Sequence, residues 1–129
     1  VLVSDEFIKE KHITKFPGGG LEFGEGTIEC VIREFKEELN LKVEVISHFY
    51  TTDFFVSSAF NAQSQVISIY YLIKAIEPLN FKTTTKTFDF EKKEGAQSFR
   101  WISLAEINES NFTFVIDKKI AELLTETKL

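Results

Sequence analysis

Three carboxylates on one predicted helix carry the clearest chemical signal in this sequence. One arc of the helix carries Glu34, Glu37 and Glu38. Another arc of similar width carries apolar residues at helical spacing, namely Ile28, Val31, Ile32, Phe35 and Leu39. Residues three or four apart are neighbours on a helix, so each like-charged pair costs it about 0.2–0.5 kcal/mol. A hard divalent cation such as Mg²⁺ would offset that cost, because it prefers carboxylate oxygens. The alternative is a solvated acidic face partly neutralised by Arg33 and Lys36.

The spacing around the predicted helix is more specific than the helix itself. From Gly19 the chain runs five residues to Glu25, then seven more, and then reads REFKEELNL over residues 33–41. This resembles the signature of the Nudix hydrolases, which include MutT-like and ADP-ribose pyrophosphatase-like enzymes: Gly, five residues, Glu, seven residues, Arg-Glu, apolar, any, Glu-Glu, any, Gly, apolar. At about one in twenty for each specified residue, chance supplies the match roughly twice in a million chains of this length.

One position departs from the signature, because Asn40 stands where the family usually has Gly. A helix that ends there needs a residue that tolerates the left-handed conformation, and Asn is the usual second choice. We therefore expect the change to be nearly neutral for fold and chemistry. At its other end the helix is expected to begin near Gly26 or Thr27, both acceptable N-caps.

The resemblance implies roles for the motif residues. It implies that Mg²⁺ or Mn²⁺ is held by the following ligands: Glu34, Glu37, Glu38 and the backbone carbonyl of Gly18. Arg33 and Glu25 would have supporting roles, because a planar guanidinium can hold a carboxylate in a fixed orientation. The alternative for this pair is a surface ion pair of little worth.

The resemblance also implies a further acidic residue, used as a metal ligand or as the general base, in a loop ahead of the late strand that contains Trp101. Glu91 and Glu94 lie in that region, in the run FEKKEGAQSFRW. Glu94, which precedes Gly95, is the preferred candidate for a catalytic role, and a motif carboxylate remains an alternative base. The opposing interpretation is an exposed charged loop.

Substrate contacts are expected at a glycine turn and at an aromatic side chain. Gly19 and Gly20 belong to a turn where the backbone can approach a ligand closely. Phe55 is a candidate for stacking on a nucleobase, although aromatic residues at strand positions more often belong to the core. Cys30 has no catalytic companion in the sequence, and we expect it to be inert.

The order of predicted elements indicates one α/β (α+β) domain over residues 1–129, the Nudix fold, with a mixed β-sheet packed between helices. Strands are expected at Val1–Ser4 and His12–Phe16, with a charged surface turn at Asp5–Lys11 between them. A long strand is expected at Gln65–Ile76, and a capping box at Ser103–Glu106 is expected to open a short helix. The last helix is expected to bury a stripe of Ile116, Ile120, Leu123 and Leu124.

Composition restricts the function classes. The net charge of −5 argues against a nucleic-acid groove, and a phosphate substrate would be repelled unless cations reverse the sign locally. A lone cysteine and the absence of a long apolar run or a signal peptide favour the cytoplasm and give no support for membrane insertion. The chain begins at Val1 without Met, and the resemblance implies that a further strand precedes it.

Taken together, the sequence predicts metal-dependent hydrolysis of a nucleoside diphosphate linked to another moiety. ADP-ribose, another nucleotide sugar and a nucleoside triphosphate are all open as substrates, and a homodimer is possible. The alternative is a Nudix-like module that senses a nucleotide or sugar nucleotide without turning it over.

Overall fold

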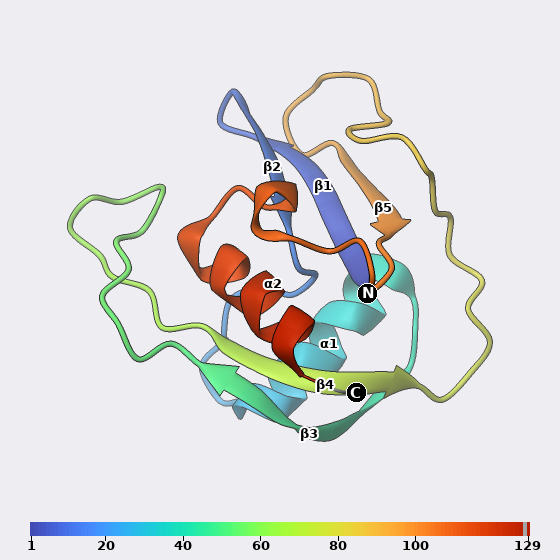
Figure 1. The fold of residues 1–129 in the computed structure, drawn as a ribbon, viewed down its shortest axis with the longest axis horizontal. Coiled ribbons are helices and arrows are strands. Elements are labelled where there is room, and N and C mark those ends of the chain that lie inside the picture. Colours follow the sequence, from blue (N-terminus) through green and yellow to red (C-terminus); the bar gives the residue numbers. More distant parts are fainter. Residues whose placement is uncertain (128) are drawn as a thin grey trace. The chain divides into compact units, whose positions relative to one another are not determined.

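The computed structural model describes residues 1–127 and 129, which form two compact units (Figure 1). Unit 1 comprises residues 1–17 and 82–129, and unit 2 comprises residues 18–81. In the part of the chain that is described, no helix combines the length and apolar character needed to cross a membrane.

Unit 1 is built on a three-stranded antiparallel sheet in the order β2-β1-β5. The strands are β1 (Leu2–Ile8), β2 (Lys11–Lys15) and β5 (Gln97–Trp101). A tight turn joins β1 to β2, and both of its residues, Lys9 and Glu10, have positive φ angles of 49° and 65°. Two left-handed residues in a row are typical of the two-residue turns whose twist matches a β-hairpin.

The predicted surface turn at Asp5–Lys11 is wrong, because β1 continues to Ile8 and Asp5 is fully buried. The Asp5 carboxylate accepts hydrogen bonds from Arg100 Nε at 2.6 Å and from Thr14 Oγ1 at 2.6 Å. A buried charge is tolerated only when it is paired and hydrogen-bonded. The polar run that indicated a turn therefore contains the buried acid of an ion pair.

The rest of unit 1 contains a short 3-10 helix, η1 (Glu109–Asn111), and the helix α2 (Val115–Glu126). Ile116, Ile120 and Leu124 are buried, so the predicted apolar stripe is confirmed at these positions.

The expected helix at Ser103–Glu106 is wrong, because this segment forms a turn in which Ile107 N–H donates to the Ser103 carbonyl at 3.0 Å. The capping interactions lie instead at Asn108, which begins η1. Its side chain accepts from Ser110 N–H at 2.9 Å, and its own N–H donates to the Asn111 side chain at 2.8 Å.

Unit 2 contains α1 (Thr27–Leu39) and a two-stranded antiparallel sheet of β3 (Val43–Thr51) and β4 (Ile69–Ala75). Strand β4 is shorter than predicted, because the chain ahead of it folds back as a loop over residues 52–68. The two arms of this loop, which extends beyond the strand ends (Figure 1), are joined by an isolated β-bridge between Ser57 and Gln65 and by backbone hydrogen bonds such as that from Thr52 N–H to the Ser68 carbonyl at 2.9 Å.

The ends of α1 lie where the sequence predicts. Gly26 is the N-cap, and Asn40 ends the helix in the left-handed conformation, with φ 49° and ψ 39°. The core face is shifted from the prediction, because Cys30, Phe35 and Leu39 are buried whereas Ile28 is 46% exposed. Ile28 lies in the first turn of the helix.

The α+β class is confirmed, and the strand pairs described in both sheets are antiparallel. The expected mixed sheet is not seen among these pairs. β1 is joined to β2 by a tight hairpin turn, which permits only antiparallel pairing, since parallel strands need a long crossover.

Candidate active site

Two further glycines, Gly24 and Gly26, lie between the glycine turn at Gly19 and Gly20 and the first residue of α1. Gly24 has a φ angle of 96°, which an L side chain rarely adopts, so the chain needs glycine just ahead of the helix. Gly26 offers no side chain as a cap, and its N–H instead donates to Glu29 Oε1 at 3.0 Å. The carboxylate of Glu29 also lies in the first turn, where the helix dipole favours a negative charge.

The Arg33 guanidinium donates two parallel hydrogen bonds to the Glu25 carboxylate. Its Nε lies 2.8 Å from Glu25 Oε2, and its Nη2 lies 2.7 Å from Glu25 Oε1. The side chains of Glu25 and Arg33 are only 13% and 21% exposed, so this bidentate pair is more than a solvated surface contact. The hydrogen bonds from Arg33 lower the pKa of Glu25 to about 2, and those to Glu25 raise the pKa of Arg33.

The same guanidinium reaches two of the predicted metal ligands. Arg33 Nη1 donates to Glu34 Oε1 at 2.8 Å and to Glu37 Oε2 at 3.1 Å. Its Nη2 also donates to the carbonyl of Gly20 at 3.0 Å. Arg33 therefore connects the glycine turn to the acidic face of α1, and one nitrogen holds the two carboxylates as neighbours.

Gly19 is in direct contact with this group. A Cβ added to Gly19 would overlap the carboxylate of Glu34, whereas a Cβ on Gly20 would meet no atom within 4 Å. The space that a side chain would fill at Gly19 is therefore taken by the Glu34 carboxylate. This gives a steric reason for glycine at the first position of the motif.

Cys30 is a neighbour that the sequence analysis did not place at the site. Its buried Sγ lies 3.5 Å from the Gly20 carbonyl oxygen and 3.6 Å from Arg33 Nη2, and burial raises the pKa of the thiol. Its position three residues before Arg33, on the same side of a helix, was the signal available in the sequence.

The carboxylates of the motif have the donor chemistry for Mg²⁺ or Mn²⁺, which prefer oxygen ligands. Among the described residues, His, Cys, Asp and Glu side chains do not converge as a group of three or more able to hold an ion. Arg33 engages one oxygen of Glu34 and one oxygen of Glu37. Glu38 is partly buried on the same helix.

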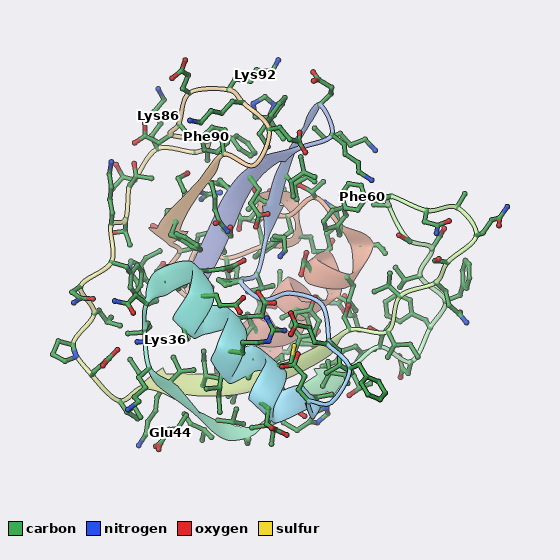
Figure 2. The ribbon with its side chains drawn as sticks, turned by 180° about the vertical axis from the view of Figure 1, so that it is seen from behind. Lys36, Glu44, Phe60, Lys86, Phe90 and Lys92 are labelled. Atoms are coloured by element: carbon green, nitrogen blue, oxygen red, sulfur yellow. The ribbon has the colours of Figure 1, made fainter. Side chains whose placement is uncertain are left out.

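The structure thus brings six of the predicted residues together within unit 2, and these are Gly19, Gly20, Glu25, Arg33, Glu34 and Glu37. Gly18 begins the same turn with a φ angle of 148°. Phe55 lies on the 52–68 loop and is 75% exposed, and Figure 2 labels Phe60 on the same loop. Glu94 belongs to unit 1, where its carboxylate accepts the N–H of Lys9.

Comparison with known proteins agrees with the motif. The model of the NUDIX domain matches residues 1–124. A solved structure of MutT, from a study of the psychrophilic fish pathogen Aliivibrio salmonicida and the mesophile Vibrio cholerae, is similar in fold. The TM-score is 0.58 at 17% sequence identity, and the match covers 98% of this chain and 85% of that one. The glycine turn, the Arg33 contacts and the match over residues 1–124 lead to one conclusion, that this chain belongs to the Nudix family.

Proposed function

We propose that this chain is a metal-dependent pyrophosphohydrolase that cleaves the diphosphate linkage of a nucleoside diphosphate joined to another moiety. The observation that carries the proposal is the arrangement around Arg33. One guanidinium holds Glu25, Glu34 and Glu37 beside a glycine turn whose first motif position has no room for a side chain.

In this proposal, bound Mg²⁺ or Mn²⁺ would supply charge neutralisation at the phosphoryl oxygens and activation of the attacking water. Glu34, Glu37, Glu38 and the carbonyl of Gly18 are the proposed ligands. Arg33 and Glu25 keep Glu34 in a fixed orientation, because a ligand carboxylate that is itself hydrogen-bonded has less freedom to move. A motif glutamate is the proposed acceptor of the proton of the water.

The acidity of the chain supports a role for cations. With a net charge of −5 the protein repels an anionic diphosphate, and the motif adds three carboxylates to the place where the substrate would bind. Bound divalent ions would reverse that local sign. Gly19 and Gly20 are the proposed close contacts with the diphosphate, and Phe55 is the proposed contact with a base.

The substrates that we propose are small molecules, namely ADP-ribose, another nucleotide sugar or a nucleoside triphosphate, and the proposed location is the cytoplasm. A sensing module would have no need to keep each motif carboxylate. Here Glu25, Glu34, Glu37 and Glu38 are all present, which favours an enzyme over a sensor.

The proposal is tested by thermal unfolding with Mn²⁺ alone, ADP-ribose alone and both together. A ligand present at 100 times its Kd stabilises the native state by about 2.7 kcal/mol, so a joint site predicts a Tm rise with both ligands that exceeds the sum of the separate shifts. Glu34→Gln should abolish that excess, whereas Glu44→Gln should keep it. Glu44 is an exposed carboxylate on β3, labelled in Figure 2, and is a matched control. The same shifts in the wild type and Glu34→Gln would contradict the proposed site.

A further inference from the structure

The acidic residues ahead of β5 lie in a loop of unit 1 that covers residues 82–96 and is called here the 82–96 loop. Figure 2 labels Lys86, Phe90 and Lys92 on it. By resemblance, Glu94 of this loop is the candidate for a metal ligand or general base. Its contacts in unit 1 indicate a different role.

The Glu94 carboxylate is directed at the backbone of the turn between β1 and β2. Its two oxygens lie 2.9 Å and 3.2 Å from the N–H of Lys9, the first left-handed residue of that turn. The neighbouring backbone holds Glu94 at this place. Gly95 N–H donates to the Phe7 carbonyl at 2.9 Å, and Phe7 N–H donates to the Ala96 carbonyl at 2.9 Å. The side chain therefore fastens the end of the 82–96 loop to the end of β1.

Two further hydrogen bonds attach the 82–96 loop at positions other than Glu94. Near its start, Thr84 N–H donates to the Phe99 carbonyl at 2.9 Å. In its middle, Phe88 N–H donates to Asp5 Oδ2 at 3.2 Å. Polar contacts thus fix the loop at its start, its middle and its end.

Aromatic rings pack the same loop onto the β1–β2 hairpin. The ring of His12 lies edge-on to Phe88 with centroids 4.8 Å apart, and it stacks parallel to Phe90 at 6.4 Å. The loop is therefore attached to the hairpin by rings as well as by carboxylates, and Glu94 supplies the contact at the hairpin turn itself.

We propose that Glu94 is a positioning residue, whose carboxylate holds the 82–96 loop on the β1–β2 turn and neither binds metal nor transfers a proton. The role needs only a hydrogen-bond acceptor. A glutamine retains that acceptor, whereas it loses the charge and the basicity that a ligand or base requires. Glu94→Gln and Glu94→Ala therefore separate the two roles.

The loop itself is tested by limited trypsin digestion, because Lys86, Lys92 and Lys93 are exposed within it. Glu94→Ala should raise the rate of cleavage at these lysines about fivefold, whereas Glu94→Gln should be cleaved at the wild-type rate. Glu91→Ala is the matched control, since Glu91 is an exposed carboxylate of the same loop and should leave the rate unchanged. An unchanged rate in Glu94→Ala would overturn the proposal.

Turnover gives the second readout and rests on the proposed function. We expect Glu94→Ala to lower kcat/KM about tenfold, and Glu94→Gln to restore both the rate and the wild-type pH profile. A loss of 100-fold or more in Glu94→Gln with wild-type protection from trypsin would overturn the proposal and make Glu94 a catalytic residue. Wild-type turnover by Glu94→Ala would also overturn it. If the wild type hydrolyses no substrate, the proposed function fails, and the trypsin comparison still decides whether Glu94 holds the loop.

Discussion

At the scale of single residues, the absence of a side chain at Gly19 determines where the Glu34 carboxylate lies. We predict that Gly19→Ala pushes this carboxylate out of position and lowers kcat/KM by 10- to 100-fold, the usual effect of disturbing a group that orients a metal site. Gly20→Ala is the matched comparison, because it adds the same methyl group at the other proposed diphosphate contact but meets no protein atom within 4 Å. Equal activity in the two variants would show that the Glu34 position does not matter. Steady-state kinetics at several Mg²⁺ concentrations make the measurement.

The pair of Glu25 and Arg33 should make stability depend on pH. The pKa of Glu25 is about 2 in the folded chain and 4.5 as the reference value, so the unfolded chain binds a proton first as the pH falls. The stabilisation is therefore complete above about pH 4.5 and is lost as the pH falls towards 2.

We predict that Glu25→Gln is less stable than the wild type at pH 7, and that its free energy of unfolding falls less steeply below pH 4.5. Urea unfolding at pH 7, 4 and 3 measures the free energy of unfolding and its dependence on pH. Glu44→Gln is the control and should keep the wild-type dependence on pH. Parallel curves for Glu25→Gln and the wild type would contradict the account of this pair.

At the scale of elements, the C-terminal end of α1 depends on Asn40. The Asn40 N–H donates to the Lys36 carbonyl at 3.0 Å while the residue adopts the left-handed conformation. We predict that Asn40→Ala lowers the free energy of unfolding by about 1 kcal/mol, because Ala lacks the short polar side chain that lets Asn tolerate the left-handed region. Asn40→Gly should not lower it, because Gly has no Cβ to strain there. Urea unfolding decides this, and an Asn40→Ala variant as stable as the wild type would refute it.

The ends of α1 could be predicted from the sequence because helix termini are encoded by nearby residues. Gly26, Glu29 and Asn40 all lie within or next to the helix. The core face was less predictable. Ile28 has the spacing of a core residue but is exposed, because burial also depends on which segments pack against each turn.

At the scale of the whole molecule, the buried ion pair of Asp5 and Arg100 joins parts of unit 1 that are far apart in sequence. The two residues are 95 positions apart, and the Asp5 carboxylate also contacts Thr14 on β2 and Phe88 in the 82–96 loop. Removal of one partner leaves an uncompensated buried charge. We predict that Arg100→Met lowers the free energy of unfolding by about 3–5 kcal/mol.

A second variant checks the physical reason for that loss. In Asp5→Leu combined with Arg100→Met, both charges are absent, so we expect the double variant to be more stable than Arg100→Met alone. Chemical unfolding of Arg100→Met, Asp5→Leu and the double variant makes the comparison, and a double variant no more stable than Arg100→Met would contradict this explanation.

This pair also shows why part of unit 1 was mispredicted. The motif on α1 was identified because Gly19 to Leu41 is one continuous stretch with a fixed spacing. The partner of Asp5 lies on another strand, and local polarity alone predicted a surface turn there. The contact between Glu94 and Lys9 was equally hidden, since it depends on how the 82–96 loop returns to the hairpin.

The most direct test of the central claim is phosphate release, with a coupled phosphatase, from a panel of nucleoside diphosphate derivatives in the presence of Mg²⁺ or Mn²⁺. The wild type, Glu38→Gln and the control Glu44→Gln are compared. We predict turnover by the wild type and by Glu44→Gln, and a loss of 100-fold or more in Glu38→Gln, because removing one ligand charge weakens metal binding. Full activity in Glu38→Gln would contradict the claim that the carboxylates of α1 form the catalytic centre. Binding of a substrate without turnover by the wild type would instead indicate a sensor.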